Sequence, residues 1–320
     1  MPQNGKGGAD ARPKSTDARA VPRTTTKQSR GTKTSSFGVS KRESHDSSEF
    51  YDSTLYNGLP KESDTGEVNP FPKNKENQIY CGDSRNMHQI PDNSVHLMVT
   101  SPPYNASKTY DDDLALSEYL ELLRSVFDEC YRVLVPGGRA CINVANLGRK
   151  PYIPLASFIN QIMIEIGFLP RGEIIWNKSA SAGVSCAWGS WKSASNPTLR
   201  DVHEYILVFS KGKYKLHRSR AEKEEGREDT VGKEDFIEWT KSIWTFPTIS
   251  AKRVGHPAPF PVELPRRCME MYTFSGDVVL DPFSGSGTTG IAAKQNGRKY
   301  LLFDISKEYC ELAEKRISEI

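Results

Sequence analysis

The sequence predicts an α/β fold in which a mixed, mostly parallel sheet is doubly wound, with helices on both faces. Short apolar runs typical of strands alternate with longer segments whose apolar residues recur at three- and four-residue steps. The run at residues 95–99 is apolar enough to be buried on both faces, as parallel strands are. Glycine-rich turns separate these segments.

The order of the elements follows from the same patterns. Strands are predicted at residues 78–81, 95–99, 140–144, 172–176, 204–209, 278–280 and 299–304. Helices are predicted at residues 116–133, 153–166, 263–272, 288–296 and 307–317. The turn Pro136-Gly137-Gly138 is expected to stop the first helix, and Gly167 the second. We find no internal repeat.

The N-terminal region differs in composition from the rest. Residues 1–75 are rich in Ser, Thr, Gly, Lys and Arg and lack apolar periodicity, so we expect a disordered basic tail, with an ordered lead-in at residues 69–75. Such a tail is either simply solvated or a salt-sensitive arm that binds phosphates. Residues 76–320 then form the folded domain, interrupted at about residues 211–245 by a charged insertion that an α/β core does not need.

The bulk composition excludes several classes of protein. The formal charge of the 320 residues is +3, so any surface that binds nucleic acid must be local. The six cysteines form no C-x-x-C pair, which argues against structural zinc and a disulfide framework. No apolar stretch reaches the roughly 20 residues of a membrane span, and the N-terminus lacks a signal-like apolar region. We therefore expect a cytoplasmic protein without a metal site.

A glycine-rich loop near the C-terminus predicts a nucleotide-like ligand. Residues 285–290 fit G-x-G-x-x-G, follow a strand and open a helix, and Asp304 ends the next strand at the spacing of a ribose-binding carboxylate. The alternative is a tight turn in an ordinary α/β unit. Only about 30 residues follow Gly290, whereas a dinucleotide enzyme usually builds half of its sheet after this loop.

A second loop closes the buried strand at residues 95–99. Ser101-Pro102-Pro103-Tyr104 lies at the carboxyl end of that strand, where open α/β sheets bind their ligands. The two prolines fix φ and stiffen the loop. A short tetrapeptide of this kind is also compatible with a plain turn that ends a strand.

Together, Thr100-Ser101-Pro102-Pro103-Tyr104 and the later Asp281-Pro282-Phe283-Ser284-Gly285-Ser286-Gly287 resemble the β-group DNA amino-methyltransferases, in which the catalytic motif precedes the cofactor motif. The resemblance covers roughly residues 77–320 and implies a Rossmann-like, permuted methyltransferase domain that uses S-adenosylmethionine. Its halves would be residues 76–210 for catalysis and 250–320 for the cofactor. The implied cofactor contacts are Asp83, Asp281, Phe283, Gly285, Gly287, Thr288 and Asp304. Asp304 would hold the ribose hydroxyls, and Asp281 would orient the loop or reach the cofactor's ammonium group.

The same resemblance implies how the amino group is held. The Ser101 side chain and the Pro102 carbonyl would accept hydrogen bonds from the exocyclic amine, and Tyr104 would stack on a base flipped out of the duplex. The Thr-Ser-Pro-Pro-Tyr form resembles the cytosine-N4 enzymes, whereas adenine-N6 enzymes more often have Asp or Asn in place of Ser101; both remain open. Cytosine-C5 methylation needs a cysteine nucleophile, usually after proline, and no Pro-Cys pair occurs. A nicotinamide-dependent oxidoreductase and an inactive DNA-binding protein are more distant alternatives.

Duplex DNA is the implied partner. In the permuted order the target-recognition region lies in the interval of the charged insertion, and the loop at residues 179–200 shares the task. Aromatic and basic side chains in these segments suit stacking and phosphate contacts. The candidates are Trp188, Trp191, Lys192, Arg200, Arg218 and Arg220. The sequence is compatible with an enzyme of a restriction–modification system, which has a cognate restriction endonuclease, and with a solitary enzyme. It is also compatible with a monomer or a homodimer.

Overall fold

The computed structural model describes residues 53–104, 114–148, 150–178, 189–249 and 260–320. The chain divides into two compact units, Met1–Gly58 and Leu59–Ile320. In the first unit, the described residues form one 3-10 turn, η1 (Thr54–Tyr56), where the Ser53 side chain accepts a hydrogen bond from the Leu55 amide. All other elements belong to the second unit.

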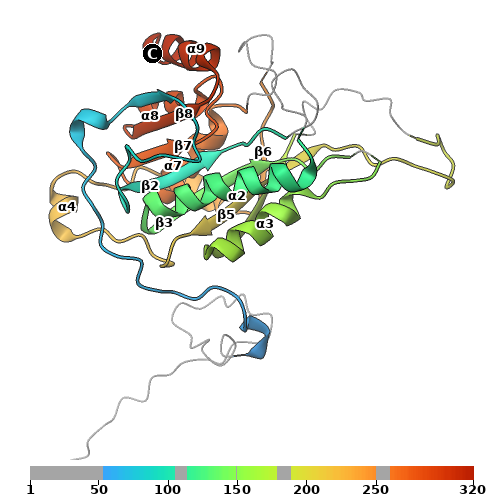
Figure 1. The fold of residues 1–320 in the computed structure, drawn as a ribbon, viewed down its shortest axis with the longest axis horizontal. Helices are drawn as coiled ribbons and strands as arrows, with labels where there is room; N and C mark the ends of the chain where they lie inside the picture. Colours follow the sequence, from blue (N-terminus) through green and yellow to red (C-terminus); the bar gives the residue numbers. More distant parts are fainter. Residues whose placement is uncertain (1–52, 105–113, 149, 179–188, 250–259) are drawn as a thin grey trace, which may run out of the picture. The chain divides into compact units, whose positions relative to one another are not determined.

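A single eight-stranded sheet runs through the described part of the second unit (Figure 1). Its strands are β1 (Gln78–Cys81), β2 (Val95–Thr100), β3 (Leu134–Val144), β4 (Leu169–Asn177), β5 (His203–Ser210), β6 (Ile243–Thr245), β7 (Val278–Asp281) and β8 (Lys299–Asp304). The spatial order is β1-β8-β7-β2-β3-β5-β4-β6. Strand β5 pairs antiparallel with β3 and β4, and the other pairs are parallel. The carboxyl ends of seven strands and the amino end of β5 therefore share one edge, called the carboxyl edge below.

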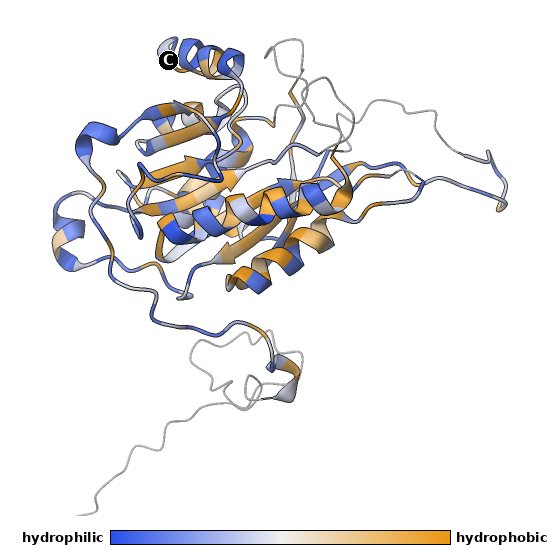
Figure 2. Ribbon diagram, viewed as in Figure 1, coloured by the Kyte–Doolittle hydropathy of each residue, from blue (hydrophilic) through white to orange (hydrophobic). Residues whose placement is uncertain are grey.

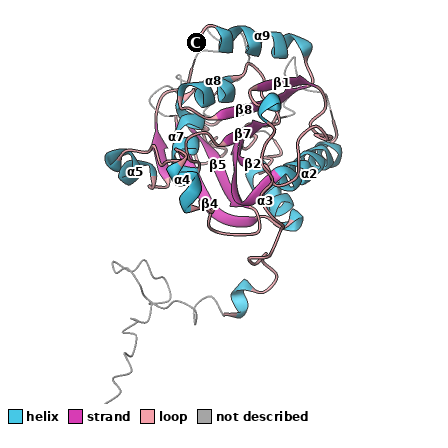
Figure 3. Ribbon diagram, turned by 90° about the vertical axis from the view of Figure 1, so that its left-hand side faces the viewer, coloured by secondary structure: helices cyan, strands magenta, loops and turns pink. Residues whose placement is uncertain are grey.

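Helices cover both faces of this sheet, as the sequence predicts (Figure 3). Helices α2 (Leu116–Val133) and α3 (Leu155–Ile166) pack on one face. Helices α5 (Lys233–Trp239), α7 (Glu263–Tyr272) and α8 (Thr288–Gln295) pack on the other, and α9 (Lys307–Ser318) packs beside α8. The remaining short elements are η2 (Lys73–Lys75) and α4 (Arg220–Glu224).

The pleat of the strands explains why the sheet needs helices on both sides. In β2, Met98 joins the apolar cluster under α2 and α3, whereas its neighbours Leu97 and Val99 join the cluster under α7 and α8. All three side chains are fully buried. Successive side chains of a strand point to opposite faces, so a strand that is apolar throughout must be covered twice. Figure 2 shows the central strands as hydrophobic and α2 with both hydrophobic and hydrophilic residues along its length.

Most predicted boundaries agree with the structure to within a few residues, and α2 and α7 agree at both ends. One prediction is wrong: Pro136-Gly137-Gly138 does not form the turn that stops α2 but lies inside β3. The helix already ends at Val133, because Leu134 is extended. In the β2–β3 register, Val95 pairs with Leu134 and Leu97 pairs with Arg139, so residues 135–138 form an irregularity in β3. Gly137 has φ +82°, which explains the glycine there.

The predicted disorder is also wrong for residues 59–68, which precede the expected ordered lead-in. Ser63 donates its amide hydrogen to the Gly212 carbonyl at 2.8 Å. The Asn93 side chain donates to the Thr65 carbonyl at 3.0 Å. Backbone hydrogen bonds to distant loops leave no periodicity in the sequence, so pattern analysis misses such a segment. The rest of the predicted tail, residues 1–52, lies outside the described residues. Within the described ranges, no helix is long and apolar enough to cross a membrane.

Candidate active site at the carboxyl edge of the sheet

The two loops that the sequence singles out lie side by side. Ser101 follows β2, and Asp281 ends β7, the strand next to β2. Asp304 ends β8, on the other side of β7. Parallel strands end at the same edge, so segments almost 200 residues apart in the sequence meet here.

Asp281 links the two loops directly. Its carboxylate accepts hydrogen bonds from the Thr100 hydroxyl at 2.7 Å and from the Thr289 hydroxyl at 2.6 Å. The Phe283 amide adds a third at 3.1 Å. Burial raises the pKa of Asp281 to about 6, and these hydrogen bonds oppose that shift. Of the two roles that the sequence left open, this geometry favours orienting the loop, because both carboxylate oxygens already have donors from the chain.

The glycine-rich loop is held by Asp304. The two carboxylate oxygens accept hydrogen bonds from the Gly285 amide at 2.8 Å and the Ser306 amide at 2.9 Å. Burial raises the pKa of Asp304, and the two amides oppose this. Gly285 and Gly287 both have positive φ, +49° and +78°. A Cβ on Gly287 would lie 2.7 Å from that of Ala313, so the loop needs glycine there.

Two observations at this loop are typical of a ligand-binding site. The N-terminus of α8 has no side-chain cap, although the first amides of a helix have no partners within it. The Ser284 hydroxyl is buried and has no hydrogen-bond partner among the described residues. Phe283 is partly buried against the core, and Thr288 is buried at the start of α8.

Asp83 lies beside this loop, since Gly82 donates its amide hydrogen to the Asp304 carbonyl at 2.9 Å. The Asp83 carboxylate pairs with the Arg85 guanidinium, with distances of 2.8 Å from Nε and 2.5 Å from Nη2. The hydrogen bond from Arg85 lowers the pKa of Asp83, against a smaller opposing effect of burial. The side chain is 40% exposed, so it remains within reach of a ligand.

The Ser101 loop is held in place by its neighbours. Pro102 is buried, and the Pro103 carbonyl accepts a hydrogen bond from the Tyr119 hydroxyl of α2 at 2.6 Å. The Ser101 and Tyr104 hydroxyls lie 3.2 Å apart. The Tyr104 ring is partly buried against the core under α2 and α3. The loop is thus braced on both the helix and the sheet.

Sequence reasoning missed three polar residues beside Ser101. Asn143 in β3 donates to Glu204 at 2.6 Å, and its amide nitrogen lies 3.4 Å from both the Ser101 and the Tyr104 hydroxyl oxygens. Lys178, after β4, forms an ion pair with Glu204 at 2.6 Å. All three residues lie at the carboxyl edge, at strand ends or one position from them. A search for polar residues at strand ends would have found them, but their convergence depends on the strand order.

The connection from β4 to β5 extends from the same edge (Figure 1, yellow-green arm). Residues 189–200 of this connection are called the arm. An isolated bridge joins Gly189 to Pro197, and the Ser190 hydroxyl accepts from the Asn196 amide at 2.9 Å. Trp191 is 64% exposed, and the Lys192 ammonium lies 5.6 Å from its ring centroid. Trp191, Lys192 and the exposed Arg200 therefore belong to a connection that leaves the sheet at the same edge as Ser101. Trp188 lies outside the described residues.

Arg218 and Arg220, the other two DNA contacts expected from the sequence, do not lie at the carboxyl edge. Arg218 forms an ion pair with Asp229 at 2.9 Å and lies over the Phe274 ring. Neighbouring Arg227 binds Asp277, immediately before β7. This part of the insertion is therefore fastened to the amino ends of the strands, opposite Ser101, and Figure 1 shows α4 and the arm at opposite edges. Sequence order alone could not reveal at which edge the insertion lies.

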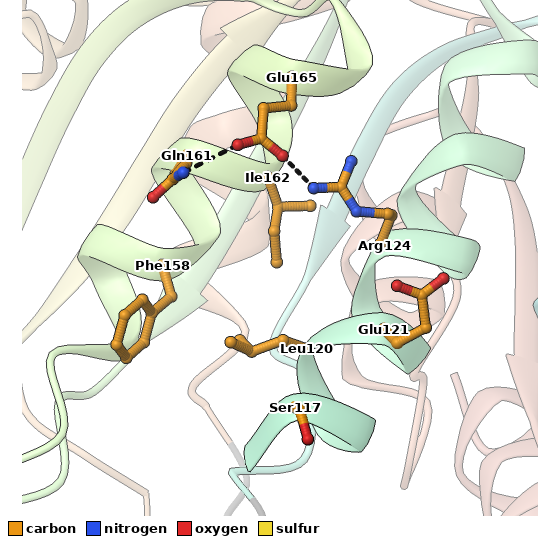
Figure 4. A pocket seen from close by; sticks show the side chains of 8 residues that line it. All are labelled: Ser117, Leu120, Glu121, Arg124, Phe158, Gln161, Ile162 and Glu165. Carbon is orange, nitrogen blue, oxygen red and sulfur yellow. Dashed lines mark hydrogen bonds and ion pairs between the residues drawn. The ribbon is translucent and has the colours of Figure 1, made fainter.

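A groove of about 280 Å³ lies elsewhere, on the outer surface of α2 and α3 (Figure 4). The Arg124–Glu165 ion pair spans it, and Gln161 donates to Glu165 at 2.8 Å. None of the predicted site residues lines this groove, so we assign it no part in the reaction. Among the described residues, no group of three or more His, Cys, Asp or Glu side chains could hold a metal ion.

A Rossmann-like sheet with this loop pair at its carboxyl edge defines an S-adenosylmethionine-dependent methyltransferase. The chain belongs to the DNA methylase family of N6 and N4 methyltransferases, whose family model matches residues 95–315. The predictions of fold class, cofactor and DNA methyltransferase activity are confirmed at this level. Family membership leaves no support for the oxidoreductase alternative.

Individual relatives agree with this assignment. The type II methyltransferase M.MjaI of Methanocaldococcus jannaschii is 32% identical over 280 residues, which cover 75% of this chain and 90% of that protein. The structure of TTHA0409 from Thermus thermophilus in complex with S-adenosyl-L-methionine is 32% identical, with a TM-score of 0.60, and covers 76% of this chain and 93% of that one. The cytosine-N4-specific PvuII DNA methyltransferase is 21% identical, with a TM-score of 0.57, and covers 76% and 90%; this likeness shows the fold alone.

Proposed function

We propose that this chain is a site-specific type II DNA methyltransferase that transfers a methyl group to the N4 amino group of cytosine in duplex DNA. The observation that supports this most directly is the position of Ser101. Its neighbour Thr100 is hydrogen-bonded at 2.7 Å to Asp281, the residue that begins the cofactor loop. A side-chain acceptor for an amine therefore lies next to the site for the methyl donor.

The chain's own groups fit S-adenosylmethionine. Asp304 has spare lone pairs for ribose hydroxyls, and the unpaired Ser284 hydroxyl together with the uncapped start of α8 offers hydrogen bonds to an amino-acid moiety. Phe283, Gly285, Gly287 and Thr288 would form the backbone and walls of this site, and Asp83 would approach the adenine side. Asp281 would act through the loop. When bound, the cofactor supplies an electrophilic methyl group on sulfur.

The residues at Ser101 would orient the nitrogen that takes this methyl group. The lone pair of an exocyclic amine is delocalised into the base ring, which makes the amine a poor nucleophile. Hydrogen bonds from its two N–H groups to the Ser101 hydroxyl and the Pro102 carbonyl favour a pyramidal nitrogen aimed at the methyl group. Pro103 would stiffen this grip. No covalent bond between enzyme and base is required.

The base itself would have to leave the duplex to reach this edge, and the Tyr104 ring would stack on it. A serine at position 101 favours cytosine N4. Adenine N6 is the alternative on the same fold, since the amine chemistry is the same. The arm would contact the DNA, with Trp191 for stacking or wedging and Lys192 and Arg200 for phosphates. Arg218 and Arg220 have no place in this proposal, and residues 1–52 would add non-specific affinity.

The test is to incubate purified full-length protein with S-adenosylmethionine and plasmid DNA, then digest the DNA and analyse its nucleosides by mass spectrometry. We expect N4-methylcytosine. N6-methyladenine would keep the mechanism and contradict the choice of base, and no methylated base on several DNA sources would contradict the proposed function.

A variant locates the active centre. Ser101→Ala should still bind S-adenosylmethionine, because Ser101 lies outside the cofactor loop, and should lose most of the transfer rate. An unchanged rate would show that Ser101 does not hold the amine. Co-purification and cleavage-protection assays would then decide between a paired restriction endonuclease and a solitary enzyme.

A further inference from the structure

A polar cluster lies where β2, β3, β4 and β5 meet at the carboxyl edge. It consists of Ser101, Tyr104, Asn143, Lys178 and Glu204. The hydroxyl groups of Ser101 and Tyr104 and the amide of Asn143 can each donate or accept a hydrogen bond. Which of them donates is fixed only if one member of the cluster can act solely as a donor or solely as an acceptor. Ionised Glu204 is such a member, because a carboxylate accepts and cannot donate.

The direction of the Ser101–Tyr104 contact follows from Glu204. The Tyr104 hydroxyl has one hydrogen, and it donates this hydrogen to Glu204 Oε2 at 3.3 Å. Burial, and then the Glu204 charge, raise the pKa of Tyr104 well above its ordinary value, so the phenol keeps its proton. Tyr104 therefore cannot donate to Ser101, and in the 3.2 Å contact between them the Ser101 hydroxyl must be the donor.

Glu204 also fixes the orientation of Asn143. The Asn143 amide nitrogen must face Glu204 Oε2, 2.6 Å away, because that oxygen accepts only. Its second hydrogen faces the hydroxyls of Ser101 and Tyr104 at 3.4 Å. Asn143 Oδ1 then points away from Glu204, and it is buried with no hydrogen-bond partner within the described ranges. One lone pair on Ser101 Oγ is left for an incoming donor.

Lys178 fixes the position of the Glu204 carboxylate. Its ammonium lies 2.6 Å from Glu204 Oε1, and the side chains are only 18% and 14% exposed. Because Oε1 binds Lys178, Oε2 is the oxygen that faces Tyr104 and Asn143 and accepts from both. The ion pair therefore holds the acceptor that sets the direction of the cluster.

We propose that the Glu204–Lys178 ion pair is a positioning device for the methyl transfer: it directs the Ser101 hydrogen toward Tyr104, so that a Ser101 lone pair faces the amino group of the target base. This inference rests on the proposed function, because it assumes that Ser101 accepts from that amine. Glu204 and Lys178 are positioning residues, since they act through Tyr104 and Asn143.

The central experiment is a double-mutant cycle in the full-length protein. It measures single-turnover methylation of plasmid DNA with enzyme in excess and S-adenosylmethionine saturating, for wild type, Ser101→Ala, Glu204→Gln and the double variant. A glutamine has one acceptor oxygen and a donating amide, so it cannot accept from Tyr104, Asn143 and Lys178 together. We expect Glu204→Gln to slow transfer about 10²-fold with unchanged cofactor affinity. In the Ser101→Ala background it should slow transfer less than about threefold.

A second measurement separates positioning from a general structural role. Lys178→Met should slow single-turnover transfer about tenfold with unchanged cofactor affinity, because Glu204 Oε1 loses the partner that fixes its position. Lys178→Arg keeps a cation at this oxygen and should restore most of the rate. A fold defect would lower the unfolding temperature and would not be rescued by arginine.

The outcomes distinguish this inference from the function on which it rests. If wild type methylates DNA and Ser101→Ala slows it strongly, but Glu204→Gln has no effect or acts equally in both backgrounds, the positioning role is wrong and the proposed function stands. An unchanged transfer rate in Lys178→Met also overturns the positioning role. If wild type methylates no DNA, or Ser101→Ala is fully active, the proposed function fails and the inference fails with it.

Discussion

Replacing Asp281 by asparagine tests whether a buried charge links the two loops of the active site. Asp281 is fully buried and accepts hydrogen bonds from Thr100, Thr289 and the Phe283 amide. Burial nevertheless raises its pKa to about 6. Asparagine has nearly the same shape and does not titrate in this range, so the variant removes the charge and keeps most of the packing.

The sign of the effect follows from linkage. The pKa of Asp281 is higher in the folded chain than in the unfolded one, where it is about 3.9. The contribution of this group to stability is therefore fully present below about pH 3.9 and is lost as pH rises through about 6. The whole loss is about 3 kcal/mol, of which about 1.4 kcal/mol falls between pH 5 and pH 7.5. Asp281→Asn avoids this loss.

The assay is urea unfolding of the protein without cofactor at pH 5, 6 and 7.5, followed by the fluorescence of the buried Trp176 and Trp244. The free energy of unfolding of Asp281→Asn minus that of wild type should rise by about 1.4 kcal/mol from pH 5 to pH 7.5. The constant cost of the altered hydrogen bonds cancels in this comparison. Glu224→Gln, an exposed change of equal charge, is the control. A difference that is flat or falls with pH would refute the reasoning.

Three further predictions concern the loop, the arm and the tail. Gly287→Ala should lower the free energy of unfolding by about 2–4 kcal/mol in urea melts, because the residue has φ +78° and its Cβ would lie 2.7 Å from that of Ala313. A loss below about 1 kcal/mol would contradict the tight packing at this position. Trp191→Ala should weaken DNA binding about tenfold in a fluorescence anisotropy titration. Arg220→Ala, at the opposite edge of the sheet, should leave DNA binding unchanged. Equal effects of the two substitutions would indicate that the charged insertion also binds DNA. Deleting residues 1–52 should leave the unfolding temperature unchanged and should reduce the dependence of DNA affinity on salt concentration. If DNA affinity depends on salt as strongly as in the full chain, residues 1–52 do not contribute to DNA binding.

The sequence by itself predicted the fold class and the two functional loops, because these depend on local patterns. Strand and helix periodicity, the helical spacing in α2, the glycine loop after β7 and the acidic end of β8 all lie within short windows of the chain. The Ser101 loop and its order relative to Asp281 also came from the sequence, through a family resemblance.

The sequence did not determine what those loops contact. Pro136-Gly137-Gly138 has the composition of a turn, yet it lies inside β3, where the Gly137 amide and the Gly138 carbonyl are hydrogen-bonded to the Lys211 backbone. Residues 59–68 have the composition of a disordered tail, yet loops far along the chain supply partners for their backbone. In both places tertiary hydrogen bonds overrode a local preference.

Only the tertiary structure decided which residues surround Ser101. Asn143, Lys178 and Glu204 come from three strands, and they meet at Ser101 because β3, β5 and β4 are neighbours in the sheet. The same strand order placed the arm at the carboxyl edge and fastened the insertion around Arg218 to the amino edge. Short windows of sequence specify elements and loops, whereas the position of a side chain in space depends on strand order and direction, which long-range packing determines.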